Sequence, residues 1–198
     1  MGLDPPYIAH PSANLLSFAK MLKRYALLFT LCLVAPFAAA QGVMSSAIAS
    51  LEAGLICPPE TVGSAPAPGT LAGTTHIIDQ EPPFVANTRR VPAVLGLGFG
   101  VKSQSTDRVG LDDVTMVVSH PPMGDRGVTV QEFQTRISGD SPSITFYQFD
   151  YAYELVPGTW QMTAMSGETA LFSVNFEVVA PRDAMDLAGV CAGLDLLS

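Results

Sequence analysis

The 198-residue sequence is poor in basic side chains, with 10 lysines and arginines against 18 aspartates and glutamates. Its formal charge is −8 and its pI is near 4.6. Proteins that bind nucleic acids or anionic membrane surfaces generally present a basic face. We therefore expect no nucleic-acid partner and no phosphate-rich ligand.

The sequence also lacks the motifs of common catalytic and cofactor sites. It contains no Gly-x-Ser-x-Gly elbow and no Cys-x-x-Cys pair, and His76 and His120 are not spaced as metal ligands. We expect no enzyme activity, no cofactor and no metal. The alternative is a zinc or copper site assembled across strands from His76, Asp79 and His120.

Two pairs of carboxylates are the remaining candidates for chemistry. Asp112-Asp113 is expected in a solvated turn, with a weak calcium site as the alternative. Asp150 is expected at a strand end, with Glu154 paired to one of the arginines in Arg89-Arg90. A hydrolase would require a cleft around such groups, and the sequence does not show one.

The N-terminal 40 residues have the pattern of a Sec-type signal peptide. A basic segment at residues 21–24 precedes an apolar run, Tyr25–Phe37, and the small residues Ala38–Ala40. Because the apolar run is shorter than the roughly 20 residues of a membrane-spanning helix, we expect cleavage before Gln41.

Translation is expected to begin at Met21, so that residues 1–20 form an untranslated leader. The cleaved chain is more acidic than the full sequence, because residues 1–40 contain three basic residues and one acidic residue. We expect a periplasmic or secreted protein with no stable membrane insertion after signal cleavage.

Two cysteines remain after cleavage, Cys57 near the start of the mature chain and Cys191 near its end. Disulfides persist in an oxidising compartment, so we expect these two to pair. Two buried free thiols are the alternative.

The clearest strands are in the segment 144–179. Large apolar residues occupy every second position in Phe172–Val178 and again in Trp160–Ala164, the period of half-buried strands. Met165–Glu168 has the composition of a tight turn between them. The sequence therefore predicts a β-hairpin here.

The segment Arg89–Lys102 predicts an unusual strand. One face is apolar, with Leu95, Leu97, Phe99 and Val101, and the other contains only Gly96, Gly98 and Gly100. No helix follows these glycines, so they do not form a dinucleotide-binding loop.

We expect the glycines to be covered by an aromatic side chain from a neighbouring strand: Tyr147, Phe149 or Tyr151. The alternative is a binding surface for a ligand or partner. The residues of this possible interaction face are Gly96, Gly98, Gly100, His120 and Trp160.

Further strands are expected at Ile48–Ile56, Leu71–Asp79, Val114–Ser119 and Val128–Ile137, separated by turn signals. Ile48–Ile56 is also compatible with a short helix, and His120-Pro121-Pro122 is expected to end the strand before it. About seven short strands of this kind indicate an all-β, antiparallel sandwich.

We therefore expect the chain after the signal peptide to have three parts. Residues 41–70 form an N-terminal strand and a Pro/Ala/Gly loop, residues 71–180 form the sandwich, and residues 181–198 form a tail tied back by the disulfide.

Several short patterns resemble an uncharacterised bacterial domain family of exported proteins. They are Arg89-Arg90-Val91-Pro92-Ala93, Leu95-Gly96, Phe99-Gly100, His120-Pro121-Pro122, Phe149-Asp150 and the run from Tyr153 to Trp160. The resemblance implies an immunoglobulin-like or fibronectin-like sandwich with no assigned activity, so it identifies no functional residue. The Pro/Ala loop after Cys57 and the tail with Cys191 depart from the pattern.

The sequence therefore favours a non-enzymatic domain that binds another protein or an envelope component. A periplasmic protein that binds a small molecule or a metal is the alternative, and a hydrolase is a more distant one. The fold class does not decide between them.

Overall fold

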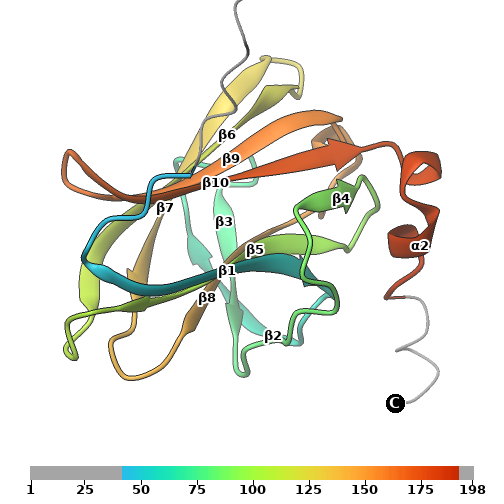
Figure 1. Cartoon of the computed structure of the whole chain (residues 1–198). Helices are drawn as coiled ribbons and strands as arrows, with labels where there is room; N and C mark the ends of the chain where they lie inside the picture. Colours follow the sequence, from blue (N-terminus) through green and yellow to red (C-terminus); the bar gives the residue numbers. More distant parts are fainter. Residues whose placement is uncertain (1–41, 192–198) are drawn as a thin grey trace, which may run out of the picture. The chain divides into compact units, whose positions relative to one another are not determined.

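The computed structural model describes residues 42–191 of the chain (Figure 1). The leader and signal peptide expected at residues 1–40, and the end of the tail at residues 192–198, lie outside the described residues. Within the described part, strands make up almost all of the regular structure. No helix there is long and apolar enough to cross a membrane.

Two sheets pack face to face, so the prediction of a β-sandwich is confirmed (Figure 1). The larger, 5-stranded sheet contains, in spatial order, β4 (Arg90–Pro92), β10 (Thr169–Val179), β9 (Gly158–Ser166), β6 (Leu111–Met123) and β7 (Val128–Ile137). The smaller, 3-stranded sheet contains β1 (Ile48–Ile56), β5 (Gly98–Ser105) and β8 (Ser143–Gln148). The short pair β4 and β10 is parallel, and the other pairs are antiparallel.

The hairpin β9–β10 forms as the sequence predicts. Its turn contains Gly167 at φ 57°, a conformation that favours glycine. The register places Trp160 opposite Phe176 and Met162 opposite Val174, and all four side chains are buried. The alternating pattern therefore directs one face of the larger sheet into the core.

The core is centred on Trp160, which is 0% exposed. Its indole packs edge-on against Phe99 of β5, with ring centroids 5.6 Å apart, so the contact joins the two sheets. Phe149 and Tyr147 pack on the same indole. The indole N–H donates to the carbonyl of Val156, 3.0 Å away, so its polar group is satisfied inside the core.

The strand β6 is longer than the sequence predicts. It was expected to end at His120-Pro121-Pro122, but it continues to Met123. The register with β7 shifts between Ser119 and Met123, which forms a bulge at the prolines. A bulge accommodates residues that cannot donate to the ladder, so these prolines interrupt the pairing without ending the strand.

Residues 61–70 are not simply the loop that the sequence predicts. Thr61–Pro66 forms a strand, β2, which pairs with β3 (Thr74–Ile78) in a separate hairpin. We call residues 61–78 the strap. Its strands β2 and β3 form no ladder with either of the two larger sheets.

The glycine face of β5 is covered, although not by the aromatic rings that were expected. A Cβ atom on Gly98 would lie 2.6 Å from Cγ1 of Ile56, and one on Gly100 would collide with the carbonyl of Thr145. β1 and the backbone of β8 therefore leave no room for a side chain at Gly98 and Gly100. The rings expected to give this cover lie elsewhere: Tyr147, Phe149 and Tyr151.

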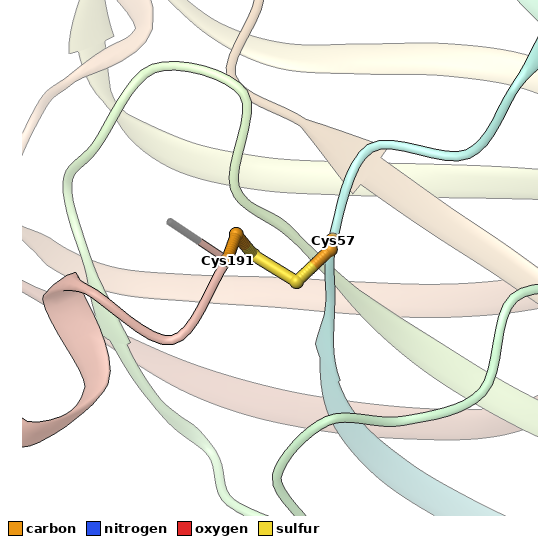
Figure 2. The surroundings of a disulfide bond; sticks show 2 residues. All are labelled: Cys57 and Cys191. Carbon is orange, nitrogen blue, oxygen red and sulfur yellow. A yellow bond between two sulfur atoms is a disulfide. The ribbon is translucent and has the colours of Figure 1, made fainter. Parts of the chain in front are cut away.

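The C-terminal tail turns twice, in the 3-10 helix η2 (Pro181–Asp183) and the short helix α2 (Met185–Ala188). Cys191 follows and is bonded to Cys57 at the end of β1, with Cα atoms 5.4 Å apart (Figure 2). The expected disulfide is therefore present, and it fastens the tail to the smaller sheet.

Candidate functional site

A cleft of about 220 Å³ lies between the strap and the strands β7 and β8. Because β7 pairs only with β6 and β8 pairs only with β5, these two strands are free edges of the two sheets. The strap therefore crosses the open side of the sandwich and leaves a space beneath it. We call this space the strap cleft.

Both polar and apolar side chains line the strap cleft. The strap contributes Thr70, Ala72, Thr74, Thr75, His76 and Ile78. The sheets contribute Gln131, Phe133, Gln134, Thr135, Ile144, Thr145, Phe146, Tyr147 and Gln148, and the segment after β8 contributes Asp150 and Glu154.

Hydrogen bonds hold the strap and its flanking loop at separate points. They join Leu71 N to Gln131 Oε1 (2.7 Å), Glu132 N to the carbonyl of Gly69 (3.0 Å) and Ile144 N to Glu81 Oε1 (2.9 Å). Between these points the strap is not paired with β7 or β8, and for this reason the cleft persists beneath it.

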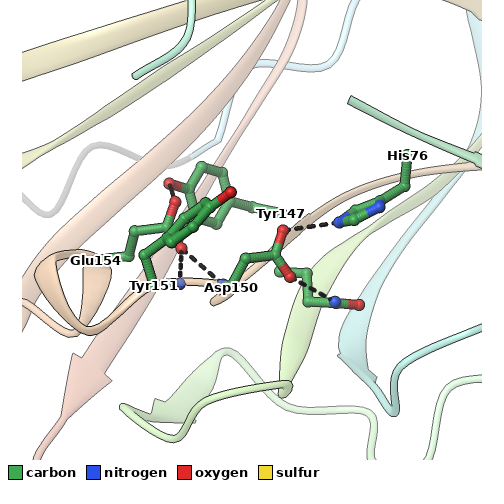
Figure 3. Close-up of polar contacts among 6 residues, drawn as sticks. His76, Tyr147, Asp150, Tyr151 and Glu154 are labelled. Carbon is green, nitrogen blue, oxygen red and sulfur yellow. Dashed lines mark hydrogen bonds and ion pairs between the residues drawn. The ribbon is translucent and has the colours of Figure 1, made fainter. Parts of the chain in front are cut away.

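His76 and Asp150 form a further contact between the strap and the sandwich (Figure 3). Nε2 of His76 lies 2.7 Å from Oδ2 of Asp150. The other carboxylate oxygen, Oδ1, accepts from Nε2 of Gln148 at 2.7 Å. The Asp150 carboxylate is thus oriented by Gln148 and bridged to the strap by His76.

Glu154 is buried at the inner end of the cleft, with 3% of its surface exposed. Its Oε2 accepts from the backbone N–H groups of Asp150 (2.6 Å) and Tyr151 (2.9 Å), and its Oε1 accepts from the Tyr147 hydroxyl (2.7 Å) (Figure 3). The expected pairing of Glu154 with an arginine is therefore wrong. Arg90 instead pairs with Glu177, at 3.5 Å.

The polar chain continues from Tyr147 into the core. Nε2 of Gln131 donates to the Tyr147 hydroxyl and to Nε2 of His120, at 3.2 Å each. Nδ1 of His120 lies 2.8 Å from the carbonyl of Pro121, so Nδ1 carries the proton and Nε2 accepts. Every member of this buried chain is satisfied, which makes it a rigid support for the cleft floor.

Burial shifts the pKa values along this chain. It raises the pKa of the Glu154 carboxyl, and the hydrogen bonds from Tyr147 and the backbone oppose the shift. It also raises the pKa of the Tyr147 hydroxyl, further supported by the neighbouring Glu154 charge. It lowers the pKa of His120, against the effect of the hydrogen bond to Pro121, so His120 is neutral at pH 7.

The lowered pKa of His120 predicts a loss of stability in acid. Below about pH 6.5 His120 takes up a proton in the unfolded chain, whereas in the folded protein it takes one up only at lower pH. Acid therefore favours the unfolded chain, and the free energy of unfolding falls as the pH is lowered. The raised pKa of Glu154 acts in the opposite sense, since its contribution falls as the pH rises above about 4.5.

Urea unfolding of the wild type and of His120→Asn at about pH 5 and about pH 7.5 separates the two effects. Because Glu154 is common to both proteins, we expect the stability advantage of the wild type to be smaller at the lower pH. An advantage independent of pH would contradict the assignment to His120.

Four residues of the possible interaction face lie inside the protein: Gly98, Gly100, His120 and Trp160. Only Gly96 is partly exposed, in the loop before β5, where it has φ 83°. These residues therefore do not form an open surface. The sequence shows which side chains share a strand face, but it does not show which face meets the second sheet.

The other residues that the sequence singled out as candidates for chemistry do not lie together. Asp112 lies within β6 and pairs with Arg136 of β7 at 3.0 Å, so it is not in a turn. Among residues 42–191, no three His, Cys, Asp or Glu side chains are grouped to hold a metal ion. The sequence singled out Asp150, Glu154 and His76 but not the cleft that they line, and the alternative metal site of His76, Asp79 and His120 does not assemble among the described residues.

The packed sheets and the aromatic core define an all-β, mainly antiparallel sandwich. Residues 45–178, more than half of the chain, match the family described as Domain of unknown function (DUF3859), and the protein belongs to this family. The resemblance to an uncharacterised family of β-sandwich domains is thus confirmed.

The chain is also similar to a solved structure, an immunoglobulin-like protein from Pseudomonas aeruginosa. The two are 22% identical, with a TM-score of 0.44, and the match covers 72% of this chain and 99% of that chain. The comparison with curated proteins found no match.

Proposed function

We propose that this protein is an exported, non-enzymatic binding module that holds a segment of a partner protein in the strap cleft. The observation that carries the proposal is the position of the cleft between the free edges of two sheets. Edge strands present backbone N–H and C=O groups that pair readily with an extended chain.

The size of the cleft favours a protein segment over a separate small molecule. Pockets for small molecules usually have volumes of about 300–1,000 Å³. The strap cleft, at about 220 Å³, is smaller and suits one or two side chains of a larger partner. The partner is a protein or another component of the cell envelope, since the signal peptide expected in the first 40 residues would direct the domain there.

The side chains of the cleft support a role without catalysis. The residues that line it include the His76–Asp150 pair and several threonines, but the hydrogen bond that His76 makes in the described structure goes to Asp150 and to no hydroxyl. The acidic Glu154 and the Tyr147 hydroxyl are engaged with each other. A histidine and carboxylate without a nucleophile hydrogen-bonded to the histidine do not form the usual hydrolytic arrangement.

Selection from a random peptide library displayed on phage tests this proposal. We expect peptides selected against the mature protein to lose at least about tenfold in affinity for Thr74→Trp, because the large ring fills the cleft. Thr74 lies on β3 and lines the cleft.

The matched control is Val62→Trp, on the other strand of the strap, where Val62 is 65% exposed and does not line the cleft. It should leave the affinity unchanged. Failure to select any peptide, or equal binding to both variants, would reject the cleft as the binding site. Binding of a small molecule instead would support the alternative function.

A further inference from the structure

The strap cleft has an unbalanced charge. Two carboxylates, those of Asp150 and Glu154, line it, and no lysine or arginine does. Glu154 is fully occupied by its three hydrogen bonds. The side chain of Asp150 is 31% exposed, so its charge is the one that a ligand can reach.

The walls of the cleft are suited to an aliphatic stem. Phe133, Phe146, Ile78 and Ile144 line it, and none of the four is fully buried. Long basic side chains bury their methylene groups on such surfaces and place the charged head at a polar group. Aromatic faces add attraction for the cation, as Phe84 does here for Lys102, whose Nζ lies 5.5 Å from the ring centroid.

We infer that the strap cleft takes a lysine or arginine side chain of the partner, with Asp150 as its counter-ion; this inference rests on the proposed function of the cleft. The stem lies between Phe133 and Phe146, and the charged head displaces His76 from the carboxylate. Gln148 keeps Asp150 in position through its amide N–H. Oε1 of Gln148 is buried with no hydrogen-bond partner in the described structure, and it becomes a second acceptor for the head once the displacement of His76 uncovers it.

The acidity of the whole protein is consistent with this partner. The chain carries a net charge of −8, and a basic segment would be attracted to it over a longer range than the cleft itself. The contact is therefore expected to weaken with salt, whereas a purely apolar contact would not.

The test uses two probes of nearly equal shape, N-acetyl-arginine amide and N-acetyl-citrulline amide, of which only the first is charged. Each is titrated into the 15N-labelled mature protein, and the backbone amide shifts of β3, β7 and β8 are followed by NMR. We expect the arginine probe to shift these amides and to bind at least about tenfold more tightly than the citrulline probe.

Two variants identify the group responsible. Asp150→Asn is expected to reduce the affinity for the arginine probe by at least about tenfold. His76→Ala removes the residue that competes for Asp150, so it should raise that affinity. If both variants lowered it, the effect of Asp150→Asn would come from a loosened strap, and the inference would be overturned.

Other outcomes overturn the inference while leaving the proposed function open to its own test. Equal binding of both probes, or no shift with either, means that the cleft does not select a cation. Peptides selected from the library that bind without any basic residue, but still lose affinity for Thr74→Trp, would uphold the cleft as a binding site and reject the basic side chain.

Discussion

Replacement of Trp160 by alanine is expected to lower the free energy of unfolding by about 3–5 kcal/mol. The indole is 0% exposed and packs between Phe99 of β5 and the His120 ring of β6, so its loss leaves a cavity between the two sheets. The carbonyl of Val156 also loses its donor. Since small domains are stable by only about 5–15 kcal/mol, the variant should unfold at a much lower urea concentration.

Two further variants separate the effect of this cavity from a general sensitivity of the domain to substitution. Trp160→Phe keeps part of the ring and should lose less than Trp160→Ala. Val109→Ala, at a side chain that is 77% exposed, should change the stability by no more than about 0.5 kcal/mol. Equal losses for Trp160→Ala and Val109→Ala would contradict the central position of the indole.

The part of the fold that the sequence predicts well is the part in which local pattern and burial agree. In β9 and β10 every second residue is apolar, and the turn between them contains Gly167, so local chemistry alone fixes the hairpin. The β-sandwich follows from several such strands and their turns.

The strap shows where this reasoning stops. Thr61–Pro66 contains small residues and proline and has no apolar alternation, yet it forms β2 because β3 pairs with it. β-Pairing depends on a neighbouring strand as well as on intrinsic preference, so a weak pattern is not enough to exclude a strand. The strap cleft was missed for the same reason.

The site was also difficult to predict because its members are far apart in the sequence. His76 and Asp150 are joined across 74 positions, and Gln131 meets Tyr147 from the opposite sheet. The sequence singled out His76, Asp150 and Glu154 as polar residues near strand ends, and this was the available signal. The residues that they contact depend on how the edge strands β7 and β8 approach each other. A single sequence does not show this arrangement.

Loss of the disulfide is expected to have the second large effect. The bond between Cys57 and Cys191 closes a loop with a sequence separation of 134. In the chain-entropy model such a loop restricts the unfolded state by roughly 5 kcal/mol, and measured losses are usually about 2–5 kcal/mol. We expect Cys57→Ala/Cys191→Ala to be less stable than the wild type by an amount in this range, measured by urea unfolding.

The intact mass of the protein purified from an oxidising compartment provides the control for this comparison. If export and disulfide formation occur as expected, the measured mass is that of a chain that begins at Gln41. An alkylating reagent then adds to the cysteines only after reduction. The reduced wild type should then have the stability of the double variant, because both lack the same constraint. If both thiols react before reduction, the bond is absent from the purified protein, which would contradict the proposed oxidising compartment. If the oxidised wild type is no more stable than the double variant, the stabilising role of the disulfide would be contradicted.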